Sequence, residues 1–191
     1  MHYTIFDTPV LRTLLRWFSL IMLRLLGWRL VGDFPRDKKY VLIGAPHTSN
    51  WDFPFTLMFC FAGGAKLYWM GKHTLFSGPA GPLMRWLGGI SVDRRQKNSL
   101  VEQMIEVYQR SDSLVVAVPP EGTRSRVSEW KTGFYHIACG AQVPIALGYL
   151  DFSRKQGGVM GLFQPTGDIA HDMPLIRARY RDVRGKCPHN Q

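Results

Sequence analysis

The sequence predicts a single α/β domain with a mostly buried mixed sheet flanked by helices, plus an N-terminal amphipathic interfacial helix. Short apolar runs such as 40–44 and 114–118 are typical of strands buried on both faces. They alternate with segments of helical spacing such as 98–110, which favours an α/β arrangement. A chain of 191 residues that is 46% hydrophobic is long and apolar enough for one domain with a real core.

Each element follows from the local pattern. The apolar runs predict strands at 40–44, 66–70, 89–92, 114–118, 143–147, 149–152 and 158–163. Helical spacing and capping residues predict helices at 53–62, 80–87, 98–110, 133–140 and 172–182. Gly and Pro residues cluster between these segments and indicate the loops.

The first part of the chain differs from the rest, and we divide the sequence into an N-terminal membrane-associating helical segment, 1–32, and a main domain, 33–191. Residues 9–30 are apolar with interspersed arginines, and the longest uncharged stretch, 17–23, is far shorter than the roughly 20 residues of a spanning helix. On a helical wheel a narrow polar arc faces a wide Leu/Trp/Phe surface, which favours a helix lying in a membrane interface. The alternative is a helix that packs on its own domain. The polar arc consists of Arg12, Thr13, Arg16, Ser19 and Arg24.

The net charge indicates which kinds of partner to expect, and the cysteine content indicates the cellular compartment. The net charge of +10 indicates an acidic partner, which nucleic acid, an anionic membrane or a phosphorylated or acidic-protein substrate would each provide. Three widely spaced cysteines, with no CxxC pair, indicate reduced thiols in the cytosol. No HExxH pair or other zinc spacing is present, and no Walker A or dinucleotide fingerprint, so we expect neither a metal nor a bound cofactor.

A histidine and an aspartate follow the first strong strand. His47 comes shortly after the apolar run 40–44, and Asp52 stands where a new helix is predicted to begin. On a loop that turns into a helix the two side chains can meet, and a paired carboxylate would fix the tautomer of a histidine acting as a general base. The alternative is a helix-capping Asp and an unrelated loop His.

Two further loops after predicted strands carry polar groups that a core does not need. One is 93–95, with Arg94, and the other is 119–126. In the second, a glycine allows close backbone approach, while hydroxyls and arginines match a phosphate. Loops at strand ends of an α/β sheet are common ligand sites. A solvated turn with ordinary surface charge is the alternative.

Together these segments resemble the glycerolipid acyltransferase family of the lysophosphatidate type. The chain shows that family's blocks in order: His47 to Asp52 as the His-x4-Asp motif, Gly89 to Arg94, and Pro120 to Ser125 as Pro-Glu-Gly-Thr-Arg-Ser. Lys131 and Gly133 resemble the Lys-x-Gly that follows the third block, and 143–145 resembles the start of the fourth.

The resemblance implies an O-acyltransferase of phospholipid biosynthesis or remodelling. It would move a fatty acyl chain from acyl-CoA or acyl-carrier protein to the hydroxyl of a lysophospholipid or related glycerolipid. It would work at the cytoplasmic face of a membrane, as a peripheral or monotopic protein. We expect His47 as the base, oriented by Asp52. The acceptor would be bound by the residues matching the second and third blocks and the lysine after them, namely Arg94, Glu121, Gly122, Thr123, Arg124 and Lys131.

Two other functions compete with this one. With water in place of the alcohol, the same site would be an acyl thioesterase. A non-catalytic basic module that binds lipid or nucleic acid would also suit the charge, although no nucleic-acid motif or stacking platform is present. Nucleophilic mechanisms fit poorly, because the segment 89–93 lacks the closing Gly of a nucleophile elbow and two of the cysteines lie in apolar runs that disfavour a thiolate.

Overall fold

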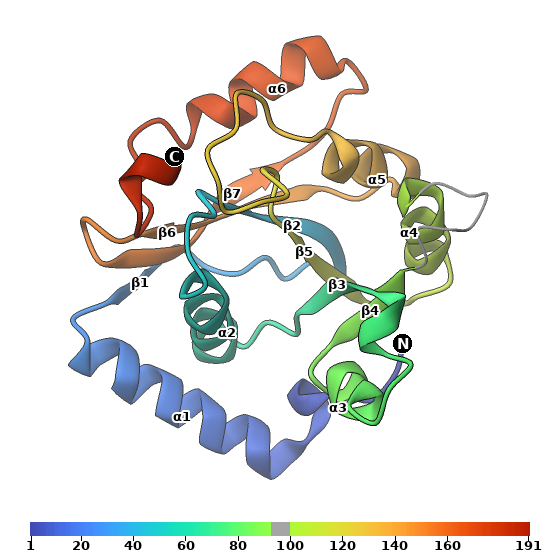
Figure 1. The fold of residues 1–191 in the computed structure, drawn as a ribbon, viewed down its shortest axis with the longest axis vertical. Helices are drawn as coiled ribbons and strands as arrows, with labels where there is room; N and C mark the ends of the chain where they lie inside the picture. The colour runs from blue at the N-terminus through green and yellow to red at the C-terminus, as the bar shows by residue number, and fades with distance from the viewer. Residues whose placement is uncertain (93–99) are drawn as a thin grey trace.

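A single mixed sheet organises the residues described by the computed structural model, which are 1–92 and 100–191 (Figure 1). The strand order is β1-β7-β6-β2-β5-β3-β4. All neighbouring strands run parallel except β6 and β7, which are antiparallel. The strands are β1 (Arg29–Val31), β2 (Lys39–Ala45), β3 (Tyr68–Lys72), β4 (Gly89–Val92), β5 (Leu114–Val118), β6 (Ile145–Asp151) and β7 (Gln156–Phe163).

Helices cover both faces of the sheet. They are α1 (Pro9–Leu25), α2 (Asp52–Gly63), α3 (Gly81–Trp86), α4 (Leu100–Gln109), α5 (Gly133–Ala141) and α6 (Ile169–Ala178). Short 3₁₀ turns lie at Ile5–Asp7, His73–Leu75 and Pro188–Asn190. The predicted α/β class, with a mixed buried sheet between helices, is confirmed.

Alternate residues of the central strand β2 supply two separate cores. Val41 and Ile43 pack with residues of α4, α5 and α6 on one face. Tyr40 and Leu42 pack with Cys60 and Phe61 of α2 on the other. Because both faces of β2 are buried, its sequence is a continuous apolar run rather than an alternating one.

Helix α1 packs against α2 through a narrow stripe that includes the buried Ser19 and Leu23. Ser19 therefore points inward rather than standing on an exposed polar arc as the helical wheel suggested. The opposite side of α1 leaves six large apolar residues more than half exposed: Val10, Leu14, Trp17, Phe18, Ile21 and Leu25. No helix among the described residues is long and apolar enough to cross a bilayer.

The predicted elements differ from the observed ones in several places; β3, for example, begins and ends two residues later than predicted, and α6 ends at Ala178 rather than near residue 182. The runs 143–147 and 149–152 form one strand, β6, in which Gly148 passes close to the backbone of β2: a Cβ there would lie 2.8 Å from the carbonyl oxygen of Ile43. Helix α6 begins three residues earlier than predicted, because Asp168 caps it by accepting from the backbone N–H groups of Ala170 and His171. Strand β1 was not predicted, because three residues are too few to show a pattern.

Candidate active site

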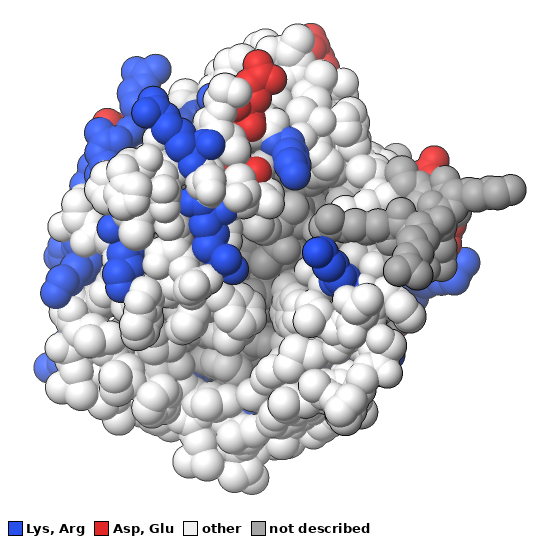
Figure 2. Space-filling view, viewed as in Figure 1, with Lys and Arg blue, Asp and Glu red and all other residues white. Residues whose placement is uncertain are grey.

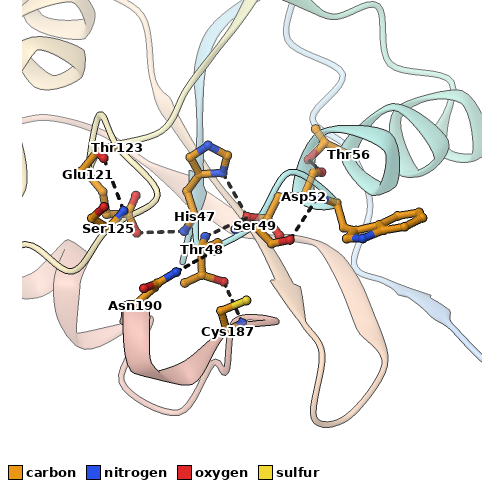
Figure 3. A network of polar contacts seen from close by, with 11 residues as sticks. His47, Thr48, Ser49, Asp52, Thr56, Glu121, Thr123, Ser125, Cys187 and Asn190 are labelled. Atoms are coloured by element: carbon orange, nitrogen blue, oxygen red, sulfur yellow. Dashed lines mark hydrogen bonds and ion pairs between the residues drawn. The ribbon is translucent and has the colours of Figure 1, made fainter.

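The loop that carries His47 lies at the carboxyl edge of the sheet. It follows β2, whose neighbours β5 and β6 both run parallel to it. The carboxyl ends of parallel strands meet at one edge, so the loop after β5, residues 119–132, lies next to the loop after β2. Figure 3 shows these two loops meeting a third segment from the end of the chain, around Cys187 and Asn190.

His47 and Asp52 form a direct pair. The Nδ1 atom of His47 lies 3.0 Å from Oδ2 of Asp52. The same oxygen accepts the backbone N–H groups of Thr48 at 2.8 Å and Ser49 at 2.9 Å. Asp52 is the first residue of α2 and is buried, so its carboxylate both closes the turn and holds the imidazole. The predicted meeting of these two side chains is present in the structure.

Glu121 supports the histidine from the other side. Its Oε1 accepts the backbone N–H of His47 at 3.1 Å, and its side chain is buried. Burial raises the pKa of the Glu121 carboxyl above its ordinary value, because the hydrogen bond from His47 only partly offsets the loss of solvation. One oxygen of Glu121 is therefore occupied in holding the loop that carries His47.

The end of the chain holds the residue next to His47. Thr48 is 3% exposed. Its hydroxyl oxygen accepts the backbone N–H of Cys187, and its carbonyl oxygen accepts Nδ2 of Asn190, both at 3.2 Å. Gly185 allows this approach, because a Cβ there would lie 2.6 Å from the Thr48 hydroxyl oxygen. Sequence reasoning missed these contacts, since nothing in a local pattern links residues 139 positions apart.

A cavity of about 520 Å³ opens onto the pair. His47, Asp52 and Arg124 all line it, whereas most of its wall is apolar. The apolar lining comes from α2, β3, β5 and β6 and includes Phe53, Leu57, Trp69, Met70, Ala117 and Leu150. A cavity of this kind accommodates a long apolar chain and presents its polar end to a histidine that is fixed by a carboxylate.

The other predicted binding residues lie around the same loop. Arg124 shares the cavity with His47. Gly122 has φ +65°, and a Cβ on it would meet the side chain of Lys131 at 2.9 Å, so Lys131 lies across the loop. Thr123 is exposed and its hydroxyl accepts the backbone N–H of Ser125 at 3.3 Å. Arg94 lies outside the described residues.

Metal-ligating groups and reactive thiols are the other features that could carry chemistry in the described part of the chain. No group of three or more His, Cys, Asp and Glu residues there is arranged to hold a metal ion. Cys60 lines the cavity, but burial raises its pKa to about 12, so its thiol stays protonated near neutral pH.

Comparison with known proteins defines the class. A family model described as acyltransferase matches residues 29–146, more than half of the chain. The chain therefore belongs to the acyltransferase family, and the resemblance seen in its motifs is confirmed.

One solved structure with a similar fold is that of PlsC from Thermotoga maritima, described as a 1-acyl-sn-glycerophosphate (LPA) acyltransferase. The TM-score is 0.64 at 18% identity, over 88% of this chain and 76% of that one. At this level of identity the match shows a shared fold. No curated protein matches the chain.

Proposed function

We propose that this acyltransferase moves a fatty acyl chain from a thioester, carried by CoA or by acyl-carrier protein, to the hydroxyl of a lysophospholipid or related glycerolipid. The observation that carries the proposal is the shared cavity: the His47–Asp52 pair and Arg124 line a hollow whose wall is mostly apolar. The apolar wall suits the acyl chain, and the arginine suits an anionic group on the acceptor.

The geometry supports a direct transfer. Nδ1 of His47 is engaged by Asp52, which leaves Nε2 to take the proton from the acceptor hydroxyl. The acceptor oxygen attacks the thioester carbonyl, a C–O bond forms, the C–S bond breaks, and the proton passes from the imidazolium to the departing thiolate. Asp52 stabilises the imidazolium during the step. A thioester is already activated, so no residue of the chain need form a covalent intermediate.

We further propose that the enzyme binds a membrane peripherally, at its cytoplasmic face. Support comes from the six exposed apolar residues on the outer side of α1, which form a stripe along the helix. Such a surface suits insertion at the boundary between headgroups and acyl chains. Cys60, Cys139 and Cys187 are free thiols, as expected in a reducing compartment.

The test is incubation of pure protein with palmitoyl-CoA, or with palmitoyl-carrier protein, and a panel of lysolipid acceptors, with products identified by mass spectrometry. We expect a diacyl product that depends on the acceptor and disappears in His47→Ala. Release of free fatty acid at the same rate with and without acceptor would identify a thioesterase instead. Unchanged product formation by His47→Ala would refute the assignment of the base.

A further inference from the structure

A group of unpaired cations lies beside the site without a role in the chemistry above. Five exposed cations and one exposed acid occur between residues 177 and 186. None of the five forms an ion pair with a carboxylate of the described residues. Figure 2 shows Lys and Arg gathered over α6 and the segment after it, whereas the end of this face near α1 carries almost none. We call Arg177, Arg181, Arg184 and Lys186 the α6 basic surface.

The α6 basic surface is continuous with the walls of the active site. The guanidinium of Arg177 donates to the carbonyl oxygen of Ser128, in the loop that also carries Glu121 and Arg124. At the other end, Nζ of Lys186 lies 4.4 Å from the ring centre of Trp51, which stands between His47 and Asp52 in the sequence. A molecule bound to this surface therefore lies beside the two loops that carry His47 and Arg124.

A groove beside the same arginines adds an apolar component. It has a volume of about 550 Å³ and runs between α6 and the loop 129–132. Trp130, Met173 and Pro174 form its apolar wall. Two arginines, Arg177 and Arg181, and one carboxylate, Glu129, line it as well. An apolar groove bordered by arginines suits a protein surface on which an apolar side chain is surrounded by carboxylates.

The location of this surface separates it from the proposed membrane contact. Helix α1 packs on α2, against one face of the sheet, whereas Ile176 of α6 belongs to the core on the opposite face (Figure 1). Helix α2, about 10 Å across, and the sheet lie between α1 and α6. Attraction to anionic lipid falls off within a Debye length of about 8 Å, so a membrane lying on α1 would contribute little at α6.

We propose that the α6 basic surface docks an acidic protein that carries the acyl thioester, so that the carrier approaches from the side opposite the membrane. This inference rests on the proposed acyl transfer. An extended row of cations joined to an apolar groove fits a carboxylate-rich protein face better than the few clustered phosphates of a nucleotide. Such a row speeds association and sets the orientation of the carrier.

The test compares two donors in two charge-reversed variants. Arg177→Glu/Arg181→Glu alters the α6 basic surface. Arg36→Glu/Lys38→Glu makes the same charge change at exposed positions before β2, at the opposite end of that strand from His47. We expect the first variant to raise KM for palmitoyl-carrier protein about tenfold or more at low salt, with kcat and KM for palmitoyl-CoA within about twofold. The control should change neither donor.

Other outcomes would overturn the proposal. An equal rise in KM for both donors would mean that the surface recognises CoA phosphates or maintains the fold. Loss of binding to vesicles containing anionic phosphatidylglycerol would mean that it contacts the membrane. If the glutamate variant does not fold, Arg177→Gln/Arg181→Gln should still raise KM for the carrier donor, and an unchanged KM would refute the docking site.

A binding measurement separates this proposal from the proposed reaction. Fluorescence anisotropy of labelled acyl-carrier protein requires no turnover. We expect binding that weakens with salt and is reduced about tenfold in the first variant only. Carrier binding without acyl transfer would refute the proposed transfer reaction and keep the docking surface. Acyl transfer with equal carrier binding by the two variants would refute the docking surface and keep the proposed reaction.

Discussion

One oxygen of Asp52, Oδ2, lies 3.0 Å from Nδ1 of His47 and also accepts the backbone N–H groups of Thr48 and Ser49. The carboxylate that orients the imidazole is therefore the same one that fixes the conformation of the loop. Its two tasks can be separated, because an amide retains a carbonyl oxygen for the backbone groups but carries no charge to stabilise an imidazolium.

We expect Asp52→Asn to fold and to lower kcat by about 10²–10⁴-fold, the range typical of base catalysis, with a smaller effect on KM. Steady-state kinetics and far-UV circular dichroism would check this. Asp52→Ala should also destabilise the protein, since two loop N–H groups lose their partner. A kcat for Asp52→Asn within twofold of wild type would show that the pair does not act in the reaction.

Glu121 gives a prediction about pH. Its folded-state pKa is raised by burial above the ordinary 4.5, so the native protein holds this proton more tightly than the unfolded chain. The contribution of Glu121 to the free energy of unfolding is therefore fully present below pH 4.5, and it is lost as the pH rises through the pKa of the folded state. Glu121→Gln keeps an acceptor for the His47 N–H and should remove this loss, so its stability relative to wild type should improve between pH 4 and pH 7. Urea unfolding at both pH values measures the difference; an identical pH dependence would contradict it.

The contacts to Thr48 predict that the end of the chain supports turnover. Asn190→Ala removes the hydrogen bond to the Thr48 carbonyl oxygen, worth about 1 kcal/mol, and lets the loop bearing His47 move. We expect kcat to fall about threefold to tenfold with KM changed by less than about twofold. His189→Ala, a neighbouring exposed residue, serves as the control. Equal kcat values for the two variants would remove this role.

The apolar stripe on α1 predicts the membrane behaviour. Leu14→Ser/Trp17→Ser/Ile21→Ser removes three exposed side chains and should leave the melting temperature nearly unchanged, because all three are more than half exposed. Binding to vesicles should weaken at least tenfold, since each large side chain contributes about 1.5 kcal/mol or more when buried in lipid. Sedimentation with vesicles checks this, with Arg36→Ser as the control. Unaltered vesicle binding would mean that α1 does not contact lipid.

The wall of the cavity predicts the choice of acyl chain. Ala117 lies on β5 and lines the cavity with Trp69 and Met70. Ala117→Leu adds volume there and should lower kcat/KM for palmitoyl donors relative to octanoyl donors by about tenfold, because overpacking a filled cavity costs 1–3 kcal/mol. Ala170→Leu, on the exposed side of α6, is the matched control. If both variants keep the same ratio, the cavity does not hold the acyl chain.

The sequence by itself determined the α/β class, the central strands and two of the segments that meet at the candidate site. These are local properties: the apolar run of β2 reflects burial on both faces, and the motifs from His47 to Asp52 and Pro120 to Ser125 are contiguous. The pairing of His47 with Asp52 was predictable because both residues lie on one short loop that leads into a helix, where their side chains can meet.

Only the tertiary structure decided which distant groups support that pair and which surfaces stay exposed. The parallel pairing of β2 with β5 brings Glu121 to the His47 backbone, and the fold returns Asn190 to Thr48. Likewise, the helical wheel of α1 shows an apolar surface but not which side packs on α2, and the structure turns Ser19 inward. Such contacts depend on where the chain passes in space, and local residue patterns do not encode that.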